Sequence, residues 1–230
     1  MKHTDAKISA ILILGLFLAG CRLQSVRDID GNRYKTVSIG TQEWLKENLK
    51  TTKFNDGTEI PLVTDPETWT ELTSPAYCWY NNDEANKDVY GALYNWHAVN
   101  TGKLCPEGWH VSADSEWVKL IVFLQEKEFS EDTGNKLKEA GTTHWKSPNS
   151  GATNESGFTA LPGGYRSFNG AFTYLGISGY WWSSTQFMES NVYFYNLRYK
   201  FGIIYKYISN KSNGFSVRCI KDQSVESGRQ

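Results

Sequence analysis

The chain has 230 residues, which suits one domain of ordinary size plus a targeting segment, or at most two small domains. Its 24 basic and 25 acidic residues leave a formal net charge of -1, so no basic field marks a nucleic-acid-binding protein. With 21% charged and 40% hydrophobic residues, the composition is typical of a folded globular protein and excludes a disordered one.

Aromatic residues make up 14% of the chain, with nine Trp and thirteen Tyr. Large rings fill a core where regular structure is sparse, and they also line surfaces that stack against sugars or peptides. Because burial is the default for such residues, we expect most of them in the core.

The first 20 residues have the parts of a secretory signal peptide. In "MKHTDAKISAILILGLFLAGC" two lysines precede an apolar stretch from Ile8 to Leu18, which is too short to span a bilayer. The ending "LAGC" resembles a bacterial lipobox, in which Cys21 is lipidated and becomes the first residue. The alternative is an ordinary signal peptide followed by an unmodified cysteine.

A lipobox implies that residues 1–20 are removed and that residues 21–28 form the lipidated cysteine and a polar tether. More than one acyl chain anchors a protein stably to a membrane. We therefore expect an exported protein, lipid-anchored to the cell envelope, with the outer membrane as the expected site. The lipid then makes the only expected contact between the protein and the membrane.

Three cysteines remain for the folded part: Cys78, Cys105 and Cys219. An exported protein meets an oxidising compartment, so one disulfide is expected. Three residues allow three different single bridges, and the spacing does not choose among them.

The first half of the domain begins with a strand-like alternation over residues 34–39, followed by an Asp-Gly turn at residues 56–57. Tyr90, Leu93, Tyr94 and His97 follow a helical spacing, which predicts a helix over this stretch.

A second helix is predicted after "CPEGWHVSADSEWVKL", residues 105–120. The apolar positions are Trp117, Leu120, Ile121 and Leu124, which lie on one helical face. Ser112 or Asp114 is the expected N-cap, since either side chain accepts a free backbone N–H. Asp114 and Glu116 also suit the positive helix end.

His110 lies just before this second helix, and no other histidine stands at metal-ligand spacing from it. We expect a packed, hydrogen-bonded histidine between Trp109 and Trp117. A catalytic alternative requires His110, Glu116 and a third polar residue to converge in an open pocket.

From residue 140 onward Gly, Asn, Ser and Thr dominate, which predicts a long loop region. Short strands are then predicted over residues 179–185, 191–199, 202–208 and 214–221. Tyr193, Tyr195, Leu197 and Tyr199 share one face of the second strand, whereas adjacent residues such as Trp181 and Trp182 face opposite ways. Early helices and late strands favour an α+β fold with many loops.

Four stretches together resemble the Fibrobacter succinogenes major paralogous domain. They are "YGALYNW", "CPEGWHVSADSEWVKL", "ATNESGFTALPGGYR" with "GYWWSST" after it, and "GFSVRCIKD". The resemblance covers residues 29–222, which leaves residues 223–230 as a disordered tail. The family is abundant in lipoproteins and surface proteins of Bacteroidetes-type bacteria.

This family is in turn similar to the C-type-lectin-like fold, which also underlies the formylglycine-generating enzymes. The similarity implies two early helices packed on a loop-rich antiparallel sheet, with a final strand beside the beginning of the domain. It also implies a bridge from Cys105 to Cys219, with Cys78 to Cys219 as the rival. One departure is Ala113, which stands where the family has the Thr or Ser of a capping box with Glu116.

No enzymatic activity is expected. The formylglycine-generating enzymes use a closely spaced cysteine pair late in the chain, and this sequence has only Cys219 there. The sequence has no G-x-S-x-G, H-E-x-x-H or Walker A motif.

No cofactor is expected, and a calcium site is the alternative. The polar run "NNDEANKD" supplies oxygen ligands at Asn82, Asp83, Glu84 and Asp88. A solvated loop is the favoured interpretation of this run, because the familiar tripeptides of calcium-dependent lectins are absent.

The expected function is recognition of a glycan or a surface protein, or a structural role in the envelope. Four aromatic residues are candidates for stacking on a ligand, and packing competes with this role at each: Trp145, Tyr165, Trp181 and Trp182. The alternatives are an enzyme related to the formylglycine-generating fold and a calcium-dependent sugar binder.

Overall fold

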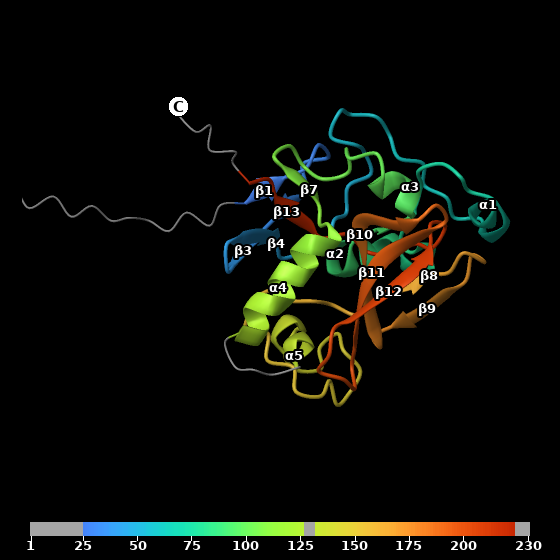
Figure 1. Ribbon diagram of the computed structural model, residues 1–230. Helices are drawn as coiled ribbons and strands as arrows, with labels where there is room; N and C mark the ends of the chain where they lie inside the picture. The colour runs from blue at the N-terminus through green and yellow to red at the C-terminus, as the bar shows by residue number, and fades with distance from the viewer. Residues whose placement is uncertain (1–24, 127–131, 224–230) are drawn as a thin grey trace, which may run out of the picture.

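The computed structural model describes residues 25–126 and 132–223 (Figure 1). The predicted α+β class is confirmed: antiparallel strands predominate, and the helices are mostly short. Within the described ranges, none of the helices has the length and apolar character needed to cross a membrane. The predictions for the signal peptide, for lipidated Cys21 and for residues 224–230 of the tail lie outside these ranges.

The folded domain begins earlier than predicted. Strand β1 (Val26–Arg27) pairs with β2 (Arg33–Tyr34), although the tether was expected to reach residue 28. Asp28 is buried, and its carboxylate accepts a hydrogen bond from the Tyr34 hydroxyl at 2.6 Å. Residues 26–28 are thus part of the fold.

The larger sheet has five strands in the order β12-β11-β10-β8-β9. Neighbouring strands are antiparallel except for β8 and β10, which meet in parallel. Figure 1 shows α4 and α5 on one side of this sheet. Its strands are β8 (Gly163–Arg166), β9 (Phe172–Leu175), β10 (Ser178–Met188), β11 (Asn191–Arg198) and β12 (Tyr205–Asn210).

The second sheet has four strands in the order β3-β4-β13-β7. The last strand of the chain therefore lies between strands from the beginning and the middle, with Ile220 opposite both Trp44 and His110. Its members are β3 (Thr36–Ile39), β4 (Gln42–Leu45), β7 (Trp109–Val111) and β13 (Cys219–Lys221). A small sheet pairs β5 (Tyr77–Cys78) with β6 (Leu93–Tyr94).

The one long helix among the described residues is α4 (Asp114–Glu126), which confirms the predicted second helix. Its apolar face packs on the five-stranded sheet, with the ring of Trp117 stacked on Tyr195 at 4.7 Å between centroids. The other helices are short: α1 (Pro66–Thr70), η1 (Tyr80–Asn82), η2 (Glu84–Asn86), α2 (Lys87–Tyr90), α3 (Trp96–Val99) and α5 (Thr133–Leu137).

The predicted helix from Tyr90 to His97 is wrong. Gly91 interrupts it with φ of 74°, and a Cβ there would lie 2.7 Å from the carbonyl oxygen of Leu49. The next N–H, that of Ala92, donates to this same carbonyl. The chain then becomes extended as β6, so the apolar spacing belongs to two short helices and a strand.

The N-terminus of α4 is capped differently from the prediction. The N–H of Asp114 donates to the hydroxyl of Thr185 at 3.0 Å, so the cap comes from the distant strand β10. The Glu116 carboxylate still accepts the N–H of Ala113 at 2.8 Å, although Ala113 cannot reciprocate. Ser112 Oγ is buried, with no hydrogen-bond partner in the part of the chain that the structure describes.

Trp181 and Trp182 belong to different core clusters on opposite faces of β10, and both are 0% exposed. The ring of Trp117 on α4 lies 6.4 Å from that of Trp181. On the other face, the ring of Phe215 lies 4.2 Å from that of Trp182. The two tryptophans thus face opposite ways, as predicted, and each lies in the core because both faces of β10 are covered.

Arg218 is fully buried just before β13, and its hydrogen bonds go to neutral oxygen atoms. Its Nη1 atom donates to the carbonyls of Leu45 and Phe158 at 3.1 and 2.8 Å. Its Nη2 atom donates to the Thr159 carbonyl, and its Nε to the Asn48 side chain. One guanidinium thus joins three segments that are distant in the sequence.

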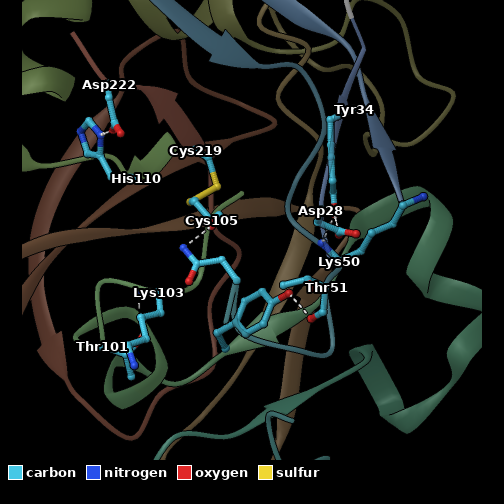
Figure 2. Close-up of a disulfide and its surroundings, with 12 residues drawn as sticks. Asp28, Tyr34, Lys50, Thr51, Thr101, Lys103, Cys105, His110, Cys219 and Asp222 are labelled. Carbon is cyan, nitrogen blue, oxygen red and sulfur yellow. Dashed lines mark hydrogen bonds and ion pairs between the residues drawn. A yellow bond between two sulfur atoms is a disulfide. The ribbon is translucent and has the colours of Figure 1, made fainter. Parts of the chain in front are cut away.

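Cys105 and Cys219 form a disulfide, which Figure 2 shows. The pairing implied by the family resemblance is confirmed. The rival pairing is wrong, because Cys78 is a free thiol buried in β5. The bond fixes β13 to the segment that leads into β7, across a sequence separation of 114 residues.

We predict that Cys105→Ser and Cys219→Ser each lower the free energy of unfolding by about 4–5 kcal/mol, because the bond closes a long loop. The double variant is expected to lie within about 1 kcal/mol of either single variant, since both remove the same bond. Urea unfolding measures these differences. Recovery of a peptide that joins Cys78 to Cys219 would contradict the pairing.

Candidate functional site

One face of the five-stranded sheet carries five tyrosines from four strands. We call this surface the tyrosine face: Tyr165, Tyr174, Tyr180, Tyr205 and Tyr207. The Tyr165 ring lies 4.7 Å from that of Tyr180 and 6.1 Å from that of Tyr174. The rings of Tyr205 and Tyr207 are stacked at 5.8 Å. Phe194 bridges the two groups, at 6.0 Å from Tyr180 and 5.8 Å from Tyr207.

Strand register places these side chains together. Tyr180 pairs with Asn196, which in turn pairs with Tyr205. Directly opposed residues share a face, as do residues two apart along a strand. Arg198, two residues after Asn196, therefore lies on the same face as the tyrosines.

Tyr174 is the most exposed ring of the tyrosine face, with 48% of its surface accessible. Its φ of 65° lies in the left-handed region, which bulky residues rarely adopt. Such strain persists only where the surrounding structure enforces it, and it is concentrated at functional sites. The β9–β10 turn thus holds an exposed ring over the half-buried ring of Tyr165.

A hollow of about 240 Å³ lies next to this ring, between the β9–β10 turn and the end of β11. Burial raises the pKa of Tyr180 to about 12, so its phenol remains a neutral hydrogen-bonding group at physiological pH. The lining residues are Tyr174, Ile177, Ser178, Tyr180, Arg198, Tyr199, Lys200 and Phe201.

Arg198 and Lys200 give the hollow its positive charge, and its lining contains no acidic residue. The Arg198 guanidinium lies 5.0 Å from the Tyr205 ring centroid, and its Nε donates to Asn196 Oδ1 at 2.8 Å. Lys200 Nζ lies 5.5 Å from the ring centroid of Tyr199. Both cations are thus held on aromatic rings at the rim.

Lys138 fixes the turn that forms one wall of the hollow. This lysine is 0% exposed, and its ammonium donates to the carbonyls of Arg198 and Phe201 at 3.4 and 3.0 Å. A third bond goes to the Ser150 carbonyl. Burial lowers the pKa of Lys138 to about 8.

Of the four predicted stacking residues, only Tyr165 belongs to the tyrosine face. Trp145, Trp181 and Trp182 are 1%, 0% and 0% exposed, so none of them presents a ring to a ligand in solution. Trp145 instead donates its indole N–H to the Ala160 carbonyl. Sequence reasoning missed Tyr174 and Arg198.

The four residues predicted as calcium ligands do not converge. Asp83 accepts the N–H of Ala85, Asp88 forms an ion pair with Lys50, and Asn82 donates to a backbone carbonyl. Glu84 lies 3.8 Å from Lys87. In the described ranges, no group of three or more His, Cys, Asp or Glu side chains is arranged to hold a metal ion.

His110 lies on the four-stranded sheet, apart from the tyrosine face. It is not packed between tryptophans but lies between two carboxylates. Its Nε2 is 2.9 Å from Glu116 Oε1, and its Nδ1 is 2.6 Å from Asp222 Oδ1. Figure 2 shows the side chains of His110 and Asp222 facing each other. Asp222 also lines an open hollow of about 880 Å³, with Lys119 and Lys221. Three polar residues thus converge, as the catalytic alternative requires, but His110 and Glu116 do not line the open hollow.

The geometry of His110 nevertheless favours a structural ion pair. The bond to Glu116, helped by Asp222, raises the pKa of His110 to about 9, against the opposing effect of partial burial. The ring is therefore protonated at neutral pH, with both N–H groups directed to carboxylates. It joins β7 to α4 and to the end of β13, and no ring nitrogen is free to accept a substrate proton.

These features define an α+β domain built on antiparallel sheets, closed by a disulfide, with a solvent-accessible aromatic surface. The model of the Fibrobacter succinogenes major domain matches residues 37–221, which is most of the chain. The chain belongs to this family. No curated protein and no solved structure matches it.

We predict that the stability due to His110 depends on pH. Its folded pKa of about 9 exceeds the unfolded value of about 6.5. The stabilisation is therefore full below about pH 6.5 and is lost as pH rises through about 9. Because the side chain is 39% exposed, we expect a contribution of less than about 1 kcal/mol.

An NMR titration of the imidazoles tests this, and Asp222→Asn should lower the pKa of His110 without altering the cap at Ala113. His97 is the internal control, because burial lowers its pKa. A His110 pKa at or below about 6.5 would contradict the ion-pair geometry.

Proposed function

We propose that this chain is a non-enzymatic recognition module that binds carbohydrate on the tyrosine face. The observation that carries the proposal is Tyr174, whose ring is exposed and whose backbone is held at a positive φ. It lies beside a hollow that is lined by further aromatic and cationic side chains. Aromatic rings stack on the apolar face of a sugar, and fixed polar groups at the rim orient its hydroxyl groups. Tyr180, Ser178 and Arg198 supply such groups.

The scaffold supports rigid presentation of these groups. Lys138 bonds to carbonyls on the turn behind the hollow, and Tyr165 packs beneath Tyr174. A ring held in place loses little conformational freedom when a ligand binds. Recognition of a protein partner and a structural role in the envelope are alternative outcomes of the binding test.

Export as a lipoprotein is part of the proposal. The Cys105–Cys219 disulfide supports it, since such bonds persist in oxidising compartments. The sequence "LAGC" supports lipid attachment at Cys21 and display from the outer membrane. We also propose a C-type-lectin-like fold, which is supported by the return of β13 to the strands at the beginning of the domain.

We predict that Tyr174→Gly lowers carbohydrate affinity about threefold to tenfold, because it removes the stacking ring. Glycine adopts positive φ without strain, so the free energy of unfolding should change by less than about 1 kcal/mol. Glycan-array and calorimetric binding measure affinity. Phe187→Ala is the matched control: Phe187 is 42% exposed and lies at the far end of β10.

Equal binding by wild type and Tyr174→Gly would contradict the site, and the absence of any glycan ligand would contradict the function. A protein ligand whose binding depends on Tyr174 would replace carbohydrate as the class of partner.

Cys21→Ser is predicted to move the protein from the membrane fraction to the soluble fraction, because the acyl chains supply the anchor. Cell fractionation and metabolic labelling with a fatty acid measure this. Cys78→Ser is the control for loss of a cysteine, and it should leave the labelling unchanged. A Cys21→Ser protein that stays membrane-bound would contradict lipid anchoring.

A further inference from the structure

The hollow beside the tyrosine face has more positive charge than a neutral sugar requires. Arg198 and Lys200 line it, and Lys146 lies close by, with its ammonium 5.8 Å from the ring centroid of Tyr199. In the described part of the chain, no carboxylate forms an ion pair with any of these three residues. The whole chain has a formal net charge of -1, so this cationic region is local.

Arg198 is held in a fixed position before a ligand arrives. Its guanidinium lies over the ring of Tyr205, and its Nε is bonded to Asn196. No other hydrogen bond engages the guanidinium within the described residues, which leaves both Nη groups available. A planar guanidinium with two such groups matches the geometry of a carboxylate or a sulfate.

Three buried cations of the fold differ from the half-buried Arg198 in this respect. Arg166 donates through all three nitrogen atoms to backbone carbonyls, and Arg218 also uses all three. Lys138 likewise bonds to three carbonyls. These groups donate to the chain itself, whereas the Nη groups of Arg198 and the ammonium of Lys200 donate to no described residue.

We propose that the ligand of the tyrosine face is an acidic polysaccharide, with sugar rings on Tyr174 and carboxylate or sulfate groups on Arg198 and Lys200. This inference rests on the proposed carbohydrate-binding function and specifies the class of sugar. Tyr174 supplies affinity for the ring, and the two cations select for charge.

The test compares polymers that share a backbone and differ in charge. Polygalacturonate is paired with fully methyl-esterified pectin, and dextran sulfate with dextran. The full chain should bind each acidic polymer at least about tenfold more tightly than its neutral partner. This preference should fall with added salt, which screens charge. The first pair reports a carboxylate ligand, and the second a sulfate ligand.

Arg198→Gln and Lys200→Gln should each reduce the preference for acidic polymers about tenfold. Lys200→Gln should leave binding to neutral polymers unchanged, whereas Arg198→Gln should also weaken it, because Arg198 helps to orient the hydroxyl groups of the sugar. Lys200 is exposed, so its variant tests charge without altering the packing. Arg33→Gln on β2 makes the same change of charge on a separate sheet and should have no effect.

The outcomes separate the two proposals. Equal, Tyr174-dependent binding of acidic and neutral polymers would overturn the acidic specificity and leave carbohydrate binding intact. Binding of no polymer would overturn both proposals. Equally tight binding of polyglutamate, or an equal loss with Arg33→Gln, would show attraction to any polyanion and would overturn the sugar specificity.

Discussion

The buried guanidinium of Arg218 is the interaction on which the rest of the fold depends. It lies one residue before the disulfide and bonds to carbonyls at Leu45 and Phe158. It also shares Asn48 Oδ1 with the indole N–H of Trp181, so it is linked to the centre of the larger sheet. Burial of a charge is costly, and full hydrogen bonding by neutral oxygen atoms is the condition that makes it tolerable. The N-terminal sheet, the long loop and β10 must therefore be in place together.

The same principle extends to the candidate site. A loop-rich chain leaves many carbonyls outside any sheet or helix, and these need donors when they are buried. Arg166 bonds to the carbonyls of Val63, Thr64 and Gly170, and Lys138 to those of the turn after β11. Long cationic side chains thus replace regular secondary structure as the source of rigidity, and the hollow inherits that rigidity.

The sequence was most informative where a local pattern controls the structure. The apolar spacing around Trp117 predicted α4, and the alternation of residues 191–199 predicted β11. It failed where a distant segment decides the outcome. Gly91 breaks the predicted helix because of its contact with Leu49, and Thr185 on β10 caps α4.

The candidate site, too, could be predicted from the sequence only in part. Tyr165 was identified as a candidate, but the burial of Trp181 and Trp182 depends on α4 and on the segment around Phe215, which local periodicity does not reveal. Tyr174 and Arg198 come from different strands and meet only at the hollow, so no local pattern in the sequence links them. Alternating polar residues at Asn196 and Arg198 were the available signal.

The position of β13 has a consequence for the order of events during synthesis. This strand completes the smaller sheet from the middle, and it brings with it both the guanidinium and the second sulfur of the bridge. A nascent chain that stops short of residue 218 lacks all three of these elements. Closure of the smaller sheet must therefore wait until β13 is available, and pairing between segments so distant in the sequence makes this step slow. Until then the domain remains open and vulnerable to proteases.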